Sequence, residues 1–228
     1  MLILDKSLKN QLVLKNKKDV PEATVRRLPV YHHYLKQLEN DGVISVSCTQ
    51  IANWLGFSPI QVRKDIEFTC VEGKPKIGYE LKDLIAHIEE FLCFHIKNEA
   101  VLVGAGHLGY ALLGYHGFKE FGLEIVAAFD NSQDKVDKFI NYKKVFSIDK
   151  LEEIISRMKI QIGILTVPAS CAQGLTDRMV AAGIKAIWNF APIKINVPKD
   201  VVVQHENLAS SLAVLSKKID ENIKRDLK

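Results

Sequence analysis

A glycine-rich run at residues 104–109 carries the clearest chemistry in this sequence. It follows an apolar stretch typical of a buried strand, opens a helical pattern and matches GxGxxG. In such a turn the first glycine permits a tight bend, the second lets the backbone approach a pyrophosphate, and the third allows close helix packing. The helix N-terminus adds free N–H groups that favour phosphate. The run therefore predicts a dinucleotide site formed by Gly104, Ala105, Gly106, His107, Leu108 and Gly109.

Asp130 supplies the second element of such a site. It ends an apolar stretch at 124–130 and follows Gly109 by 21 positions, where a carboxylate bonds the adenosine ribose hydroxyls of NAD. The next three residues, 131–133, include no arginine that could receive a 2′-phosphate. We therefore expect NADH and NAD⁺ rather than their phosphorylated forms.

Alternating strands and helices must position these residues. Apolar stretches at 100–104, 124–130, 144–148, 161–168, 186–192 and 201–205 are separated mostly by helical patterns, which predicts a mostly parallel Rossmann sheet over residues 98–207. Loops at the carboxyl ends of such strands line the ligand crevice. The residues expected beside the nicotinamide are Thr166, Val167, Pro168, Asn189, Phe190, Ala191 and Pro192. His107 is interpreted as a solvent-side residue over the pyrophosphate rather than a catalytic base.

The front of the chain predicts a helix-turn-helix. Ser47 and Gln50 form a capping box, Gly56 ends the first short helix, and Ser58-Pro59 begins the second. Burial of the second helix is expected through Ile60, Val62 and Ile66. Its outer face and the basic hairpin at 69–79 then give the candidate DNA contacts, which are Ser58, Gln61, Arg63, Lys64, Lys74 and Lys76. The alternative, an ordinary solvated helical face and loop, stays open on pattern alone.

These segments set the expected organisation as an α/β protein with an added winged-helix domain. Residues 1–20 are a flexible basic arm, 21–80 the winged-helix domain, 81–97 a connecting helix and 98–207 the Rossmann domain. Residues 208–228 form a terminal helix with an apolar stripe that needs a partner, which favours a homodimer. The stripe consists of Leu208, Leu212, Leu215 and Ile219, with Val214 alongside.

Composition narrows the class of protein. The net charge is only +4, and 25% of residues are charged, as in soluble globular proteins. The four cysteines show no CxxC pair, so neither a metal site nor a disulfide framework is expected. No apolar stretch is long enough for a membrane helix, and the start is too soon charged for a signal peptide, so we expect a cytoplasmic protein.

The length left outside these domains argues against an enzyme. No room remains for a substrate domain, and no Ser/Tyr/Lys or His/Asp set stands near the crevice. We expect a domain that binds a dinucleotide and reports on it. Two alternatives remain: a small NAD(H)-dependent oxidoreductase with an accessory helical domain, and a dinucleotide sensor that acts through a protein partner.

The chain resembles the Rex family of bacterial redox-sensing transcriptional repressors over residues 20–215. The segments that carry the resemblance are PEATVRRLPVYHHYL (21–35), QVRKD (61–65), IGY (77–79), VGAGHLGYAL (103–112), GYHGF (114–118), IVAAFD (125–130), LTVPA (165–169), AAGIKAIWNFAP (181–192) and VPKDVVV (197–203). The resemblance implies a homodimer that binds operator DNA when NADH is scarce, releases it when NADH binds, and exchanges its C-terminal helix between subunits.

The resemblance also implies roles for individual residues. Gly104, Gly106, Gly109 and Asp130 would hold the adenosine and pyrophosphate, and Tyr115 would join Thr166, Pro168 and Phe190–Pro192 around the nicotinamide. Arg63 and Lys64 would belong to the recognition helix. The interdomain switch would involve Arg26 or Arg27 and the position of Asn207.

Two positions depart from the family's pattern. After QVRKD the family usually has a Leu-Ser-Tyr-Phe-Gly run, whereas this chain has Ile66-Glu67-Phe68-Thr69-Cys70. Glu67 adds an acidic group close to the expected DNA surface, and the glycine is missing. Near the last helix Asn207 stands where the family tends to place an aspartate, and an amide can hydrogen-bond but cannot form an ion pair with arginine.

Overall fold

The computed structural model describes residues 20–226, which belong to two compact units. The first unit ends at Ile96 and the second begins at Lys97. Apart from Val20, the predicted basic arm lies outside the described residues, as do residues 227 and 228. None of the helices in the described part of the chain is long and apolar enough to span a membrane.

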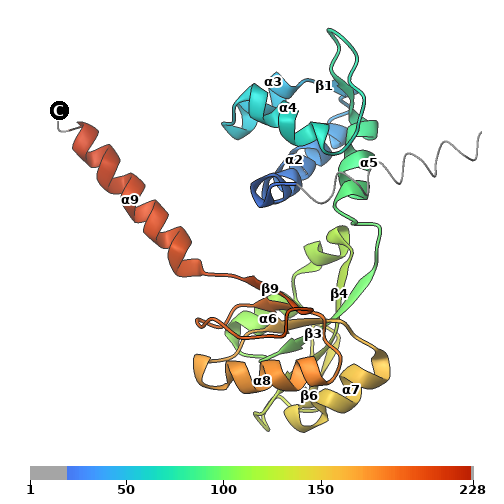
Figure 1. Ribbon diagram of the computed structural model, residues 1–228, viewed down its shortest axis with the longest axis vertical. Coiled ribbons are helices and arrows are strands. Elements are labelled where there is room, and N and C mark those ends of the chain that lie inside the picture. The colour runs from blue at the N-terminus through green and yellow to red at the C-terminus, as the bar shows by residue number, and fades with distance from the viewer. Residues whose placement is uncertain (1–19, 227–228) are drawn as a thin grey trace, which may run out of the picture. The chain divides into compact units, whose positions relative to one another are not determined.

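The first unit is a winged helix (Figure 1). Its elements, in order, are α2 (Glu22–Asn40), β1 (Ser45–Val46), α3 (Cys48–Leu55), α4 (Pro59–Glu67), β2 (Tyr79–Glu80) and α5 (Leu81–Phe91). β1 pairs antiparallel with β2, and Lys74 bridges to Gly78 in the loop before β2, which forms the wing. The predicted helix-turn-helix is therefore α3 and α4.

Local signals explain how α3 and α4 begin and end. The predicted capping box is present, with the Ser47 side chain accepting from the Gln50 N–H and the Gln50 side chain accepting from the Ser47 N–H. Gly56 ends α3 in the left-handed conformation. The prediction that Ile60 is buried is wrong, because Ile60 is 70% exposed. Val62 and Ile66 are buried as expected, and the third inward position of α4 belongs to Asp65.

The predicted connecting helix is shorter than expected and serves the first unit's core. Its apolar face, Leu81, Leu84, Ile85 and Ile88, packs in the same cluster as α2, α3 and α4. The helix ends at Phe91 rather than at residue 97. Cys93 turns left-handed (φ 60°), and the N–H groups of Cys93 and Phe94 bond the carbonyls of Glu90 and Glu89, which closes the last turn.

The second unit is a seven-stranded sheet with the order β5-β6-β4-β3-β7-β8-β9. The strands are β3 (Asn98–Val103), β4 (Leu123–Asp130), β5 (Phe139–Ile140), β6 (Lys143–Ser147), β7 (Ile162–Leu165), β8 (Ala186–Asn189) and β9 (Val202–His205). Only the β5–β6 pair is antiparallel. The chain builds outward from β3 in one direction and then from β7 in the other, so a topological switch point lies between β3 and β7. The predicted Rossmann topology is confirmed.

Helices cover both faces of this sheet (Figure 1). Alternate residues of β3 face opposite sides, with Val101 and Val103 in one apolar cluster and Ala100 and Leu102 in the other. The first cluster includes side chains of α7 and α8, and the second includes Leu113 of α6. The helical elements are α6 (His107–Leu113), η2 (His116–Phe121), η3 (Ile148–Lys150), α7 (Leu151–Met158), α8 (Ala169–Ala181) and α9 (Leu208–Asp226).

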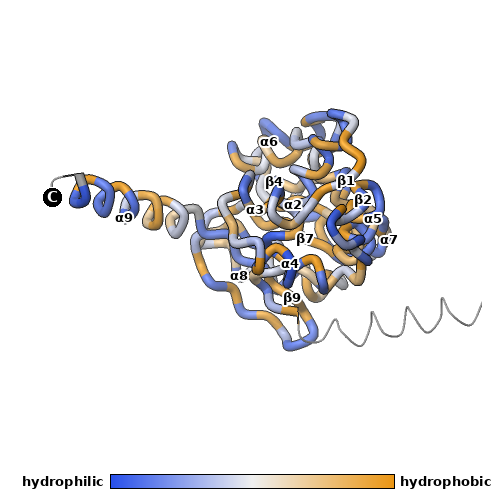
Figure 2. The backbone as a smooth tube through the Cα atoms, turned by 90° about the horizontal axis from the view of Figure 1, so that it is seen from above, coloured by the Kyte–Doolittle hydropathy of each residue, from blue (hydrophilic) through white to orange (hydrophobic). Residues whose placement is uncertain are grey.

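Helix α9 carries the predicted apolar stripe on its surface. Apolar and polar residues alternate along it (Figure 2). Five apolar side chains of this helix are each more than half exposed, namely Leu212, Val214, Leu215, Ile219 and Ile223. The side chain of Leu208, also part of the predicted stripe, lies outside the described residues.

Cys70 gives a stability prediction. It follows α4 in the left-handed conformation (φ 59°), which costs a residue with a Cβ about 1–2 kcal/mol. Replacing Cys70 by glycine removes that cost. It also destabilises the folded state by about 0.5–1 kcal/mol, because glycine has more conformational entropy to lose on folding. We expect Cys70→Gly to raise the free energy of unfolding of the first unit by about 0.5–1 kcal/mol in urea titrations. Cys70→Ala keeps the Cβ and should be nearly neutral, so equal stability of the two variants would contradict the argument.

Candidate functional site

The glycine loop between β3 and α6 needs each of its three glycines for a different reason. Gly104 has φ +103°, and a Cβ there would lie 2.7 Å from the Thr166 carbonyl oxygen. A Cβ at Gly109 would lie 2.0 Å from the Gly104 oxygen, so α6 packs directly on the loop. At Gly106 a Cβ would meet no protein atom within 4 Å. The loop is thus tight against the protein at two glycines and open at the third, where the backbone can approach a ligand.

Asp130 and Thr166 hold this loop from the neighbouring strands. Asp130 Oδ2 accepts the Ala105 N–H at 2.8 Å, and the Thr166 hydroxyl donates to the Gly104 carbonyl at 2.7 Å. Asp130 is only 8% exposed, and its Oδ1 accepts the Ser132 N–H at 2.8 Å. The carboxylate predicted to bind a ribose therefore also fixes the loop that would bind the phosphates.

A cleft of about 460 Å³ opens where these elements meet. It brings together six of the sequence-predicted residues, namely Gly104, Gly106, Asp130, Thr166, Val167 and Pro168. Ala105 and Gly109 are buried beside it, and His107 and Leu108 are exposed on the first turn of α6. Sequence reasoning missed Lys135, Cys171 and Arg178, which also line the cleft. Extending the search for cations beyond residue 133 would have found Lys135.

The residues expected beside the nicotinamide lie at the ends of β7 and β8. Asn189 is fully buried, and its amide bonds the Ala191 N–H, the Ile193 carbonyl and the His205 ring, so it shapes the turn after β8. Ala191 is buried and Pro192 exposed. Phe190 connects to Tyr115 through a chain of ring contacts, from Tyr115 to Phe118 (4.8 Å), Trp188 (5.6 Å) and Phe190 (4.9 Å). The fold thus links these two predicted residues through aromatic packing.

The first unit presents a basic surface on α4 and the wing. Arg63 and Lys64 of α4 are exposed, as are Lys74 and Lys76 of the wing. A cleft of about 440 Å³ lies between the wing and the start of α3 and is lined by Arg63, Lys74 and Lys76. Of the other predicted contacts, Ser58 is exposed and makes no capping bond, and Gln61 is half-buried. This arrangement suits contact with a polyanion.

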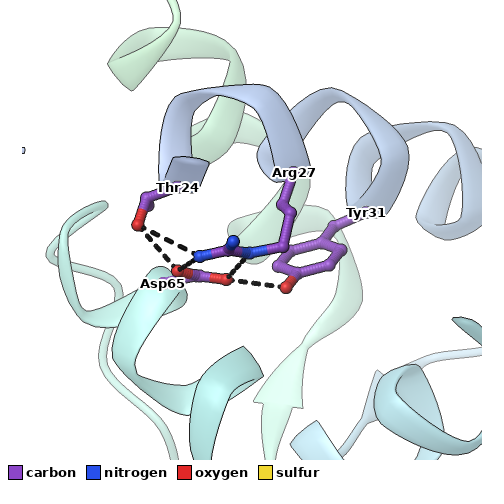
Figure 3. Close-up of polar contacts among 4 residues, drawn as sticks. All are labelled: Thr24, Arg27, Tyr31 and Asp65. Carbon is purple, nitrogen blue, oxygen red and sulfur yellow. Dashed lines mark hydrogen bonds and ion pairs between the residues drawn. The ribbon is translucent and has the colours of Figure 1, made fainter. Parts of the chain in front are cut away.

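Asp65 anchors α4 to α2 through four hydrogen bonds (Figure 3). Arg27 donates from Nε to Oδ2 at 2.7 Å and from Nη2 to Oδ1 at 2.8 Å. The Tyr31 hydroxyl donates to Oδ2 at 2.7 Å, and the Thr24 hydroxyl to Oδ1 at 2.8 Å. Turned toward Arg27, the Gln61 amide oxygen accepts from its guanidinium at 3.1 Å. Asp65 is 2% exposed and the Arg27 side chain is 20% exposed, so a part-buried ion pair beneath α4 sets the position of that helix.

The network shifts the ionisation of its members. Burial raises the pKa of the Asp65 carboxyl, but the bonds from Arg27, Tyr31 and Thr24 outweigh burial and hold that pKa below its usual value of 3.8. Burial and the bond to Asp65 raise the pKa of the Tyr31 hydroxyl. Asp65 is therefore charged and Tyr31 neutral at ordinary pH.

The three residues expected in an interdomain switch have local partners in the structure. Arg26 is exposed and pairs with Glu22, and Arg27 pairs with Asp65 as described. Asn207 Oδ1 accepts the N–H groups of Ala209 and Ser210 at 3.0 and 3.3 Å, which caps the start of α9. Within residues 20–226, no group of three or more His, Cys, Asp or Glu could hold a metal ion.

Comparisons with known proteins agree with this arrangement. A family model described as a putative DNA-binding protein N-terminus matches residues 19–67, and one described as a CoA binding domain matches residues 95–193. A redox-sensing transcriptional repressor Rex of Treponema denticola is 50% identical over 200 residues, which is 87% of this chain and 95% of the relative. A protein of the same description from Porphyromonas gingivalis W83 is 45% identical over 210 residues, covering 92% of this chain and 96% of the relative.

Solved structures of a Rex-family repressor, RSP, also match. The complex of RSP with β-NAD⁺ and operator DNA has a TM-score of 0.83 and 34% identity, covering 92% of this chain and 97% of RSP. The complex with β-NADH has a TM-score of 0.82 and 34% identity, covering 92% and 98%. A winged helix followed by a dinucleotide-type Rossmann unit defines the class of ligand-responsive DNA-binding regulators. Within that class, this chain belongs to the Rex family of redox-sensing transcriptional repressors.

The Asp65 network predicts a pH-dependent stability. The pKa of the Asp65 carboxyl is lower in the folded chain than its usual value of 3.8. The ionised carboxylate therefore stabilises the first unit fully at pH values above 3.8. This contribution to the free energy of unfolding disappears as the pH falls through the lower pKa of the folded state. Asp65→Asn leaves the Arg27 guanidinium, which is 20% exposed, without its anion and should cost about 2 kcal/mol at pH 7 through the loss of charge-assisted hydrogen bonds.

Denaturant titrations of the full chain at pH 7 and across acid pH measure both effects. Tyr31→Phe removes one of the four bonds and should cost about 1 kcal/mol. A loss for Asp65→Asn no larger than that for Tyr31→Phe would show that the ion pair does not anchor α4.

Proposed function

We propose that this chain is an NADH-responsive transcriptional repressor that binds palindromic operator DNA as a homodimer and releases it when NADH binds. The observation that carries the proposal is the presence, on one chain, of an open glycine loop over a cleft and a basic recognition helix held by a part-buried ion pair. The names of its relatives and the ligands of RSP support the same function. The protein acts as a cytoplasmic regulator and not as an enzyme.

The second unit binds the dinucleotide across the carboxyl ends of its strands. The pyrophosphate lies against Gly106 and the start of α6, where free N–H groups attract anions. Asp130 accepts a hydroxyl of the adenosine ribose. The nicotinamide lies toward Tyr115 and the turn at residues 190–192. Burial there of the positive ring of NAD⁺ costs free energy that the neutral NADH ring does not, which favours the reduced form.

The first unit binds the operator through α4 and the wing. Arg63 and Lys64 project from α4 into the major groove, and Ser58 reaches the backbone from its N-terminus. Lys74 and Lys76 bring the wing to neighbouring phosphates. Since a two-fold protein matches a palindromic site, each subunit binds one half-site.

A second copy of the chain covers the exposed stripe of α9, and the helix is exchanged between subunits. Leu212, Leu215 and Ile219 lie on one side of α9, a pattern that needs an apolar partner. NADH binding changes the half-site spacing of the DNA-binding units, through a switch in which Arg26, Arg27 and Asn207 take part. Such coupling amounts to about 1–3 kcal/mol and is reciprocal between DNA and ligand.

The function is tested by fluorescence anisotropy of a labelled A/T-rich palindrome with the purified full chain. NADH is titrated against a fixed excess of NAD⁺, and we expect binding that NADH weakens about 5- to 150-fold. Lys74→Ala, which removes a wing cation placed near a phosphate, should bind DNA more weakly with or without NADH and should lower the slope of log affinity against log salt by about 1.

Three other results would contradict the proposal or favour a different function. DNA binding that NADH and NAD⁺ change equally would contradict redox sensing. Absence of salt-sensitive DNA binding, also with operator fragments selected from genomic DNA, would favour a sensor that acts through a protein partner. Steady turnover of NADH with carbonyl substrates would favour an oxidoreductase.

Gly106 separates the two activities. A Cβ at Gly106 would meet no protein atom within 4 Å. A valine side chain there would extend into the space in which the pyrophosphate lies. We expect Gly106→Val to fold, to bind operator DNA, and to lose at least about tenfold in NADH affinity by calorimetry. Gly174→Val, at an equally open glycine of α8 outside the cleft lining, is the matched control and should keep NADH binding. NADH affinity equal in the two variants would place the ligand elsewhere.

A further inference from the structure

The corner of the cleft expected to hold the adenosine ribose contains a cation beside its carboxylate. Lys135 Nζ lies 3.1 Å from Asp130 Oδ2, and both residues line the cleft. The backbone places Lys135 there, because the N–H groups of Lys135 and Val136 bond the Ser132 carbonyl at 3.0 and 3.1 Å in a turn after β4. Residues 131–133 contain no arginine, but Lys135, two positions further on, forms an ion pair with Asp130.

The hydrogen bonds of Asp130 leave it little free capacity. A carboxylate offers about four acceptor positions. Oδ2 accepts from the Ala105 N–H and from Lys135, and Oδ1 accepts from the Ser132 N–H. About one position remains for a ribose hydroxyl. The negative charge that would repel a phosphate on that ribose is therefore offset by the Lys135 ammonium.

Of the two cationic side chains that line the cleft, Lys135 is the one that is free to move toward a ligand. Its side chain is 36% exposed and carries its charge on a flexible four-carbon stem. Arg178, the other cation that lines the cleft, is held by Glu152 and by the Ile148 carbonyl. A phosphate entering beside Asp130 would meet the Lys135 charge first.

We propose that Lys135 is a specificity-determining residue. It sets how strongly the cleft rejects a phosphate on the adenosine ribose, and hence the ratio of the NADPH and NADH dissociation constants. This inference rests on the proposed function. Lys135 lowers that ratio by offsetting Asp130, so a chain without the Lys135 charge rejects NADPH more strongly.

The test compares NADH and NADPH binding to the full chain by calorimetry at low ionic strength. Lys135→Met should raise the NADPH-to-NADH ratio of dissociation constants about five- to tenfold, because the unopposed Asp130 charge repels the added phosphate. The ratio for NAD⁺ to NADH should not change, since both carry the same ribose. Lys135→Arg keeps the charge and should keep the wild-type ratio.

Lys138→Met is the matched control. Lys138 is exposed three residues further on and does not line the cleft, so its removal should leave the ratio unchanged. An unchanged ratio in Lys135→Met, or an equal rise in Lys138→Met, would overturn the inference. If the wild-type chain bound no NADH, the proposed function would fail. The Lys135 effect would then be measured with ADP and with its 2′-phosphate, which both lack the nicotinamide. The same ratio of their dissociation constants in wild type and in Lys135→Met would overturn the inference.

Discussion

The close approach of the backbone between β3 and β7 is the constraint on which the second unit depends. A Cβ at Gly104 would collide with the Thr166 carbonyl, and a Cβ at Gly109 with the Gly104 carbonyl. A side chain at either position would force α6 away from the sheet and displace the glycine loop that lines the cleft. Asp130 and Thr166 bond the same loop from β4 and β7. The carboxyl edge of the sheet thus holds the loop in place before any ligand arrives.

Features set by neighbours in the chain could be predicted from the sequence. The capping box of Ser47 and Gln50, the left-handed Gly56 and the roles of the loop glycines follow from local backbone geometry. The six main strands follow from apolar stretches of suitable length, and their mostly parallel arrangement follows from the helical crossovers between them. These features were enough to place the cleft and six of the residues that line it.

Features set by distant residues could not be predicted in this way. Arg27 and Asp65 are 38 positions apart, and no period in the sequence marks a charge that will be buried. Asp65 takes an inward position on α4, and Ile60 points to solvent instead. The end of α5 at Phe91 was missed because Cys93, and not a glycine, takes the left-handed conformation. Lys135 requires the turn after β4, which brings its side chain back to Asp130.

Helix α9 has a consequence for the kinetics of association. Its ion pairs, Lys217 with Asp220 and Glu221, and Lys224 with Asp220, are all within the helix, and Asn207 caps its first turn. Such pairs stabilise an isolated helix by about 0.2–0.5 kcal/mol each, and 19 residues exceed the length at which helices are marginal. These features favour helix formation before any partner binds. In the proposed homodimer, an encounter between two chains would then join helices that are already largely formed, so its rate would be limited more by orientation than by a transition from coil to helix.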